Sequence, residues 1–391
     1  MSVILPLTPV DYFFTGTGAH PLTFAFSYKE NLDPAVLRRC LDETLKHFPI
    51  LSSKLRRTSE HDYVFQMKDD GLSFETFKSS FSFDELKDVR QIITPVRSKE
   101  EEPLTKIKLM QTPKGSVLAV SISHALVDGF SYFHFLSSWA SICKGQRILK
   151  PSLQREQLLP GITDHKKPIT FDSILAHCGL FYEQKRHELG TDPIREERIF
   201  ISREIIRSHL EEAKQKYEIS FSENDIITAL LWKKYIPLWS DGKHNPTTYV
   251  TCPYDFRRSL RELSKTYLGC ALCFATASID FEGLVKASLG DLALLVRNAV
   301  GKINRDYILG SLQALETLRR KNGLGAMEKL HLRHPQHGIV VTNITRLPIR
   351  DLDFGTGAPV SFLTYTEILR GAAIFPEENG VEILVLHPPN S

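Results

Sequence analysis

The sequence lacks long hydrophobic runs and has no excess of charge of one sign. None of its stretches approaches the roughly 18 uninterrupted apolar residues that a membrane span needs. The 49 basic and 46 acidic residues give a formal net charge of +3, and the basic pairs are scattered rather than gathered into a patch that would bind nucleic acid. We therefore expect neither a membrane span nor a nucleic-acid partner.

Cysteine is scarce, with six residues spread through the chain. Only Cys270 and Cys273 have the CxxC spacing, and no second pair or nearby histidine completes a zinc site. We expect both to be small buried residues of a strand, with redox or metal use as the alternative, and no bound metal. The first residues lack a basic start and contain two early prolines, which predicts no signal peptide and a cytoplasmic protein.

What is present indicates a globular protein with two mixed α/β halves. The chain has 391 residues, more than one hydrophobic core usually serves, and 42% of them are hydrophobic and 24% charged. Residues 145–170 are rich in Pro, Gly, Lys and Gln and form the best linker candidate, with a long surface loop as the alternative. The expected domains are residues 1–165 and residues 166–391.

Apolar periodicity and turn residues predict the elements of each half. Asp33 and Pro34 supply an N-cap and a first-turn proline, which predicts a helix over 34–48 that Pro49 ends. The other elements of the first half are strands over 22–28, 51–57, 62–67, 72–77, 104–111 and 116–123 and a helix over 129–143. The second half has helices over 203–217, 226–239, 283–304 and 306–322 and strands over 197–202, 247–253, 274–280, 338–343, 359–366 and 380–386.

A histidine and a carboxylate four residues apart, followed by a glycine, form the most informative motif. His124-Ala-Leu-Val-Asp128-Gly129 lies between the strand predicted over 116–123 and the helix predicted over 129–143. Catalytic residues are often placed on such loops, held by a rigid scaffold. An imidazole can accept a proton near neutral pH, which makes His124 a candidate general base. The alternative is an ordinary loop or core histidine.

Three further segments follow in the second half. The first runs from Ser222 to Trp232 and has Asp225 as its fourth residue. The second is Asp255-Phe-Arg257, followed by Tyr267-Leu-Gly269. The third is Asp353-Phe-Gly-Thr-Gly357. Each alone has an ordinary explanation, as a core helix, a charged turn and a glycine-rich loop. Together with HxxxDG, and in this order, they resemble the BAHD acyltransferases over essentially the whole chain.

The resemblance implies a two-lobed, chloramphenicol-acetyltransferase-like α/β fold, each lobe a mixed sheet covered by helices, with an active-site tunnel between the lobes. It implies that His124 is the general base and that Asp128 points away from substrate and pairs with Arg257. Gly129 would allow a tight turn and leave room for substrate. A largely structural loop, which also reaches the substrate side in some members, would comprise Asp353, Gly355, Thr356 and Gly357.

Three positions depart from the family pattern. Ser259 stands where the family has a second arginine. Thr356 stands where the family has a tryptophan, and Cys270 stands where it has an asparagine after the Tyr-x-Gly segment. A threonine can donate a hydrogen bond but does not fill the volume of an indole. The three departures bear on which acceptor the protein takes.

The resemblance also implies the substrates. The chain would move an acyl group from an acyl-CoA thioester to a hydroxyl or amine of a small-molecule acceptor, without a covalent acyl-enzyme. No cofactor would be bound, and the P-loop and Rossmann glycine patterns are missing. Two alternatives stay open: an acyl carrier protein as donor, and a cyclase or small-molecule-binding protein that keeps the fold without transferring acyl groups. We expect a monomer.

Overall fold

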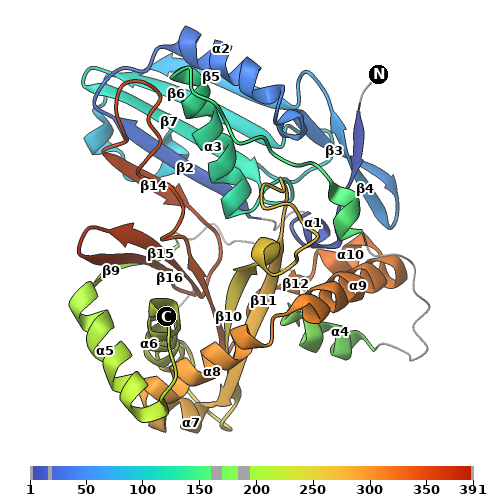
Figure 1. The fold of residues 1–391 in the computed structure, drawn as a ribbon, viewed down its shortest axis with the longest axis vertical. Coiled ribbons are helices and arrows are strands. Elements are labelled where there is room, and N and C mark those ends of the chain that lie inside the picture. The colour runs from blue at the N-terminus through green and yellow to red at the C-terminus, as the bar shows by residue number, and fades with distance from the viewer. Residues whose placement is uncertain (1–2, 16–19, 160–169, 184–193, 389–391) are drawn as a thin grey trace.

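Two large sheets dominate the structure, a computed structural model that describes residues 3–15, 20–159, 170–183 and 194–388. Figure 1 shows them as two lobes, one above the other, with a five-stranded sheet in the upper lobe and a six-stranded sheet in the lower one. Helices cover both sheets, so the mixed α/β architecture expected from the sequence is confirmed.

The upper sheet is built around a strand that is buried along its whole length. β7 (Gly115–Ser123) is an apolar run in which all nine residues are buried, as expected of a strand covered on both faces. It pairs antiparallel with β2 (Pro21–Tyr28) and β6 (Thr105–Thr112), and β5 (Leu72–Lys78) runs parallel to β6 at the edge. The last residue of β7 lies at the junction of the two lobes.

Two helices pack on each other over the upper sheet (Figure 1). α2 (Pro34–Leu45) begins as predicted, because the Asp33 side chain accepts hydrogen bonds from the first-turn N–H groups. It ends before the predicted 48, since a short 3-10 helix (Pro49–Ser52) follows and takes the place of the first residues of the strand predicted over 51–57. α3 (Gly129–Cys143) follows the HxxxD loop and has the predicted bounds.

The lower sheet has the order β11-β10-β13-β15-β16-β9. Its helices pack mainly on one another and on β11 and β13, and α8 contacts both α5 and α6. The strands are β9 (Glu196–Ser202), β10 (Thr247–Asp255), β11 (Leu272–Asp280), β13 (Gly338–Asn343), β15 (Gly371–Glu377) and β16 (Gly380–Leu386), and the helices are α5 (Arg203–Tyr217), α6 (Glu223–Trp239), α7 (Phe281–Lys286) and α8 (Leu289–Gly301).

Smaller elements join the lobes at their side. α1 and α10 contact α9, as does α4, and a three-stranded sheet has the order β1-β4-β3. These elements are β1 (Ile4–Pro6), α1 (Pro9–Phe13), β3 (Ser53–Ser59), β4 (Asp62–Met67), α4 (Phe171–Cys178), β8 (Phe181–Tyr182), α9 (Arg305–Asn322), α10 (Leu324–Met327) and β12 (Leu330–His331), with further 3-10 helices at Phe83–Glu85, Val89–Gln91, Arg155–Leu158 and Phe256–Arg258.

One strand of the second half belongs to the sheet of the first. β14 (Ser361–Tyr365) pairs antiparallel with β2, in the register Ser361 to Ser27, and the chain then returns to the lower sheet at β15 (Figure 1). The domain expected over residues 166–391 therefore lends a strand to the domain expected over 1–165. Period-two patterning marks a strand but not its partner, which explains why the sequence did not reveal this exchange.

One other prediction needs correction, and β15 and α1 are among the elements that the sequence did not predict. The single helix predicted over 283–304 is two helices, because Ser288 and Asp291 form a capping box that starts α8. β15 was not predicted, since glycine and proline at its ends masked a short apolar run. α1 was missed because it is shorter than the usual helix pattern.

The predicted linker over 145–170 is packed where the structure describes it. Arg155 is fully buried, donates to the Pro6 carbonyl at 2.9 Å and forms an ion pair with the buried Asp11. Ser152 forms a parallel bridge with Tyr267. Residues 160–169, and with them the expected boundary at 165, lie outside the described residues.

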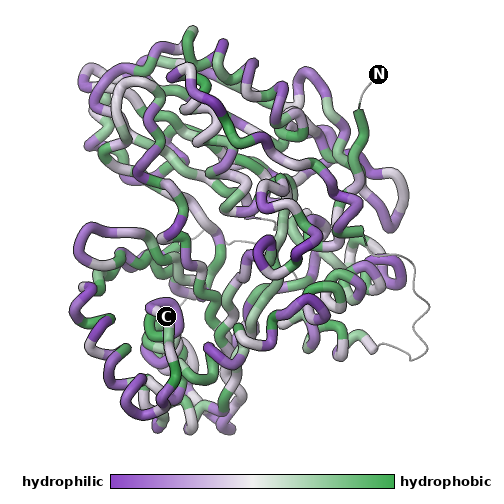
Figure 2. Tube along the Cα trace, viewed as in Figure 1, coloured by the Kyte–Doolittle hydropathy of each residue, from purple (hydrophilic) through white to green (hydrophobic). Residues whose placement is uncertain are grey.

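The hydrophobic core follows the strands and the inner helix faces, as the tube in Figure 2 shows. Among the helices of the described ranges, none is long and apolar enough to cross a membrane.

Candidate active site at the junction of the lobes

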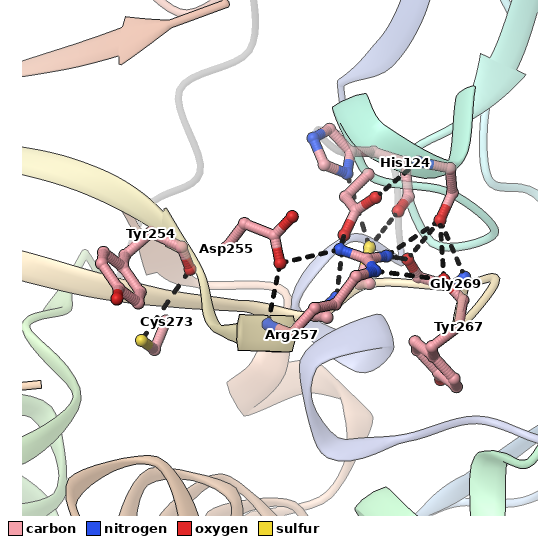
Figure 3. Close-up of polar contacts among 11 residues, drawn as sticks. His124, Tyr254, Asp255, Arg257, Tyr267, Gly269 and Cys273 are labelled. Carbon is pink, nitrogen blue, oxygen red and sulfur yellow. Dashed lines mark hydrogen bonds and ion pairs between the residues drawn. The ribbon is translucent and has the colours of Figure 1, made fainter. Parts of the chain in front are cut away.

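His124 follows β7 directly and faces residues from distant parts of the chain (Figure 3). The thiol of Cys270, which precedes β11 of the lower lobe, donates to the His124 carbonyl oxygen at 2.8 Å. The same sulfur lies 3.6 Å from His124 Nδ1. The predicted base therefore lies where the two lobes touch.

An aromatic ring covers one face of the imidazole. The rings of Phe14 and His124 are stacked with centroids 3.9 Å apart and planes 6° from parallel. Phe14 is itself buried and packs edge-on against Phe13. The stack fixes the plane of the imidazole, while Cys270 faces its Nδ1 edge.

The imidazole is held in its neutral form. Burial penalises the charged ring and lowers the pKa of His124 from 6.5 to about 4, against the opposing effects of a hydrogen bond with its own backbone and of the Asp128 carboxylate. Within the described residues no hydrogen bond occupies Nε2. A neutral ring with a free Nε2 lone pair can accept a proton.

Asp128 caps the helix that follows the motif. Its Oδ1 accepts from the Ser131 N–H at 2.9 Å, which satisfies a donor of the first turn of α3. Its Oδ2 accepts from Arg257 at 2.6 Å and from the Ala271 N–H at 2.9 Å. Both oxygens are therefore engaged by α3, by Arg257 and by the loop before β11.

Arg257 joins that carboxylate to the loop before β11. Burial favours the neutral form, but Asp128 and Asp255 outweigh it, and the pKa of the guanidinium is raised. The side chains of Arg257 and Asp128 are only 3% and 1% exposed. Besides Asp128, the guanidinium donates to Asp255 at 3.0 Å, Ser131 Oγ at 3.0 Å, the Gly269 carbonyl at 2.9 Å and the Tyr267 carbonyl at 3.1 Å.

Gly129 has a different role from the one expected. It is the first residue of α3 and its φ is not positive, so the turn does not require glycine. A Cβ placed there would lie 3.1 Å from Leu347 Cδ1. The glycine makes room for Leu347, from the loop after β13.

The glycine-rich loop lies at the other end of β7 from His124. Its Phe354 packs edge-on against Trp139 of α3, with centroids 5.0 Å apart, and against Tyr28. Tyr28 pairs with Ser116, whereas the histidine follows Ser123, and the strand between them spans roughly 23 Å. The structure therefore does not bring this loop to the base.

The residues expected on the substrate side form a self-contained exposed loop instead. Asp353 Oδ1 accepts from the N–H groups of Gly355 and Gly357, at 2.8 and 2.9 Å. Both glycines have positive φ, 106° and 102°, which only glycine adopts without strain. Thr356 is exposed between them, and Lys144 pairs with Asp353 at 3.3 Å. The position does not demand the volume of an indole.

The Ser222 segment also has a structural role. Ser222 and Asp225 form a capping box at the start of α6. Asp225 is buried and pairs with Arg297 of α8. The motif thus anchors two helices of the lower lobe.

Sequence reasoning missed Phe14 and Cys270 as parts of the site. Nothing near Phe14 marks it, because a stack between residues so far apart depends on the folded chain. Cys270 carried a signal, since it replaces an asparagine directly after Tyr267-Leu-Gly269. Cys270 is buried as expected, but it lies just before β11 rather than in it, and it contacts His124.

Comparison with known proteins agrees with this arrangement. Residues 2–390 match the family model described as Transferase family. A hydroxycinnamoyl-CoA:5-hydroxyanthranilate N-hydroxycinnamoyltransferase from Avena sativa is 25% identical over 390 residues, covering 90% of this chain and 82% of the relative. An alcohol acyl transferase 1 from Malus domestica is 25% identical over 372 residues, covering 85% and 75%.

A solved structure shares the fold. The crystal structure of F. graminearum TRI101 complexed with ethyl coenzyme A superposes with a TM-score of 0.79 at 13% identity, covering 100% of this chain and 96% of that one. The two-lobed fold expected from the sequence is confirmed. With a family match over nearly its whole length, the chain belongs to the Transferase family of BAHD acyltransferases, enzymes that use acyl-CoA as co-substrate.

Proposed function

We propose that His124 is the general base of an acyl transfer from acyl-CoA to a hydroxyl or amine of a small molecule. Nε2 takes the proton of the acceptor as its oxygen or nitrogen attacks the thioester carbonyl. The tetrahedral intermediate then collapses, the carbon–sulfur bond breaks, and His124 returns the proton to the CoA thiolate. The products are an ester or amide and free CoA, and no acyl-enzyme forms.

One observation carries this assignment. The His124 ring is stacked on Phe14 and faces Cys270 with Nδ1, which leaves Nε2 as the lone pair available to a substrate. Base assistance of this kind contributes about a hundred- to ten-thousand-fold to a rate. Asp128 does not relay the proton, since Ser131, Arg257 and Ala271 occupy its oxygens.

The place of the site supports a passage between the lobes as the route to His124. Ligand sites occur preferentially at domain interfaces. A passage of this kind would bring donor and acceptor together without a covalent intermediate, because alignment alone supplies a large part of the rate.

The nature of the donor and acceptor is tested directly with the wild type. Acyl-CoA thioesters of increasing size, and one acyl group carried on an acyl carrier protein, are incubated with a panel of alcohols and amines, and free thiol and product are measured. We expect product from CoA thioesters, formed about a hundred- to ten-thousand-fold more slowly by His124→Ala. Transfer only from the carrier-bound acyl group would replace CoA as donor, and the absence of transfer from any donor would overturn the proposal.

We further propose that the enzyme acts as a monomer in a reducing compartment, the cytoplasm. The site supports the first point because Asp128, Arg257 and His124 are brought together within one chain. Cys270 supports the second, since its thiol must stay reduced to donate to His124. Size-exclusion chromatography with light scattering, and the location of a tagged protein in cells, test the two points.

A further inference from the structure

A second histidine lies beside His124, and the proposed reaction does not use it. His20 directly precedes β2, whose first residue, Pro21, pairs with Ser123, the last residue of β7. The two histidines therefore stand one residue beyond the same ladder pair. They are close enough that a positive charge on His124 would lower the pKa of His20.

A buried carboxylate stands behind His20. Glu367, which follows β14, is 1% exposed and accepts two hydrogen bonds of 2.5 Å from the Arg97 guanidinium. The Tyr365 hydroxyl donates to the same carboxylate. Burial would raise the pKa of Glu367, but the hydrogen bonds of Arg97 and Tyr365 outweigh it, so the pKa is lowered and the group is ionised.

The carboxylate lies beside the buried nitrogen of the His20 imidazole. His20 Nδ1 is buried, lies 4.0 Å from Glu367 Oε2 and has no hydrogen-bond partner among the described residues. An adjacent negative charge favours the tautomer with its proton on Nδ1. The His20 side chain is 28% exposed. The Nε2 lone pair, on the opposite edge of the ring, is therefore free to accept a hydrogen bond.

His20 is neutral as well. Burial lowers its pKa from 6.5 to about 4, more than Glu367 raises it. Two neutral imidazoles thus lie at neighbouring strand ends, and each has a lone pair for a donor group. Only one of them is needed as the base.

We propose that His20 binds a second hydroxyl or N–H group of the acceptor, so that the enzyme prefers acceptors such as diols or amino alcohols over those with a single nucleophilic group. This inference rests on the proposed function, since it places the nucleophile at His124. His20 accepts one hydrogen bond and thereby orients the neighbouring group toward the base. Glu367 and Arg97 are positioning residues, because they act through His20.

The test compares matched acceptors in the full-length enzyme. Cyclohexane-1,2-diol is paired with cyclohexanol, and catechol with phenol, each with the acyl-CoA that the wild type uses best. We expect the wild type to prefer the diol of each pair. His20→Phe, which keeps a ring but has no acceptor nitrogen, should lose about tenfold in this preference, the value of one hydrogen bond of about 1.4 kcal/mol.

Two further variants keep the test specific. His20→Gln places an amide oxygen near the Nε2 position and should retain most of the preference. His177→Leu, on the exposed side of α4, serves as the matched control and should behave as the wild type. The KM for acyl-CoA should stay within about twofold in all variants, since the lost bond of about 1.4 kcal/mol is made to the acceptor alone.

Several outcomes overturn the inference. These are equal kcat/KM for diol and mono-ol in the wild type, an unchanged preference in His20→Phe, or a raised KM for acyl-CoA in place of the acceptor effect. A wild type that acylates other alcohols but neither diol overturns it too. A wild type that acylates nothing overturns the proposed function instead.

Discussion

At the scale of single residues, two side chains fix the His124 imidazole from different directions. Phe14 covers one face with centroids 3.9 Å apart, and Cys270 lies 3.6 Å from Nδ1. Together they set the ring plane and the direction of Nε2. They also keep water away, which is the physical cause of the low pKa of about 4.

Phe14→Leu should move the pH dependence of the reaction. The base must be neutral in the free enzyme, so kcat/KM of the wild type should rise through about pH 4 and be level at neutral pH. Removing the stacked ring admits water, so the pKa of His124 rises toward 6.5 and the acidic limb shifts upward. Phe13→Leu is the control, because Phe13 packs on Phe14 and Phe274. An unchanged limb, or an equal shift in the control, contradicts this account.

At the scale of elements, one ion pair joins the loop before α3 to the 3-10 helix after β10. Asp128 and Arg257 are both buried and hydrogen-bonded by several backbone groups, including Ala271 and Gly269. An isolated buried charge is costly, whereas a paired one is tolerated. The pair therefore links the loop after His124, in the upper lobe, to the lower lobe.

Urea unfolding of Asp128→Asn, Arg257→Met and the double variant measures this coupling. Arg257→Met leaves the buried Asp128 carboxylate without a cation and should lose roughly 3–5 kcal/mol of unfolding free energy. Asp128→Asn leaves Arg257 with Asp255 as its ion-pair partner and should lose less. The double variant should lose at least 1 kcal/mol less than the sum, on the order of coupling within one network. The same cycle on the exposed pair Glu282–Lys286 should give about 0–1 kcal/mol. Additive losses at Asp128 and Arg257 would contradict the inference that this ion pair couples the two lobes.

At the scale of the whole molecule, three partly buried histidines, one of them beside the strand that crosses between the lobes, make the unfolding free energy depend on pH. β14 leaves the lower lobe to pair with β2, and His20 and Glu367 lie beside that crossing. Burial lowers the pKa of His20, His124 and His334 to about 4. In the unfolded chain each takes up a proton near pH 6.5, whereas in the folded chain each does so only near pH 4.

The unfolding free energy should therefore fall as the pH is lowered from about 6.5 to about 4. In this window the unfolded state binds more protons, and each histidine contributes up to about 1.4 kcal/mol per pH unit, less where water reaches the ring. Urea titrations at pH 7, 6 and 5 measure the slope, and His334→Gln should flatten it without touching the site. Equal stability at pH 7 and pH 5 would contradict the assignment.

How much the sequence reveals depends on the range of the interactions involved. The loop after β7, the N-cap of α2 and the start of α6 depend on neighbouring residues, and local patterns predict them. The partnership of Asp128 with Arg257 came from family resemblance, and the structure brings the two together. Phe14, His20 and Glu367 reach the site through tertiary contacts that no local pattern records.

The departures from the family pattern lie at different distances from His124 in the fold. Thr356 lies on an exposed loop roughly a strand's length from the base, closed by Asp353 and its two glycine contacts. Cys270 contacts the base itself. The sequence marks both positions equally, because it does not tell how far each lies from His124.

The central claim is that His124 performs the chemistry, and the turnover of His124→Gln tests it most directly. The measurement is kcat at saturating acyl-CoA and acceptor, with the melting temperature and its shift on adding CoA recorded for the same samples. The account predicts that kcat falls by about a hundred- to ten-thousand-fold while both melting properties match the wild type. A folded, CoA-binding His124→Gln with kcat within about threefold of the wild type would contradict it, since general-base assistance is worth far more than that.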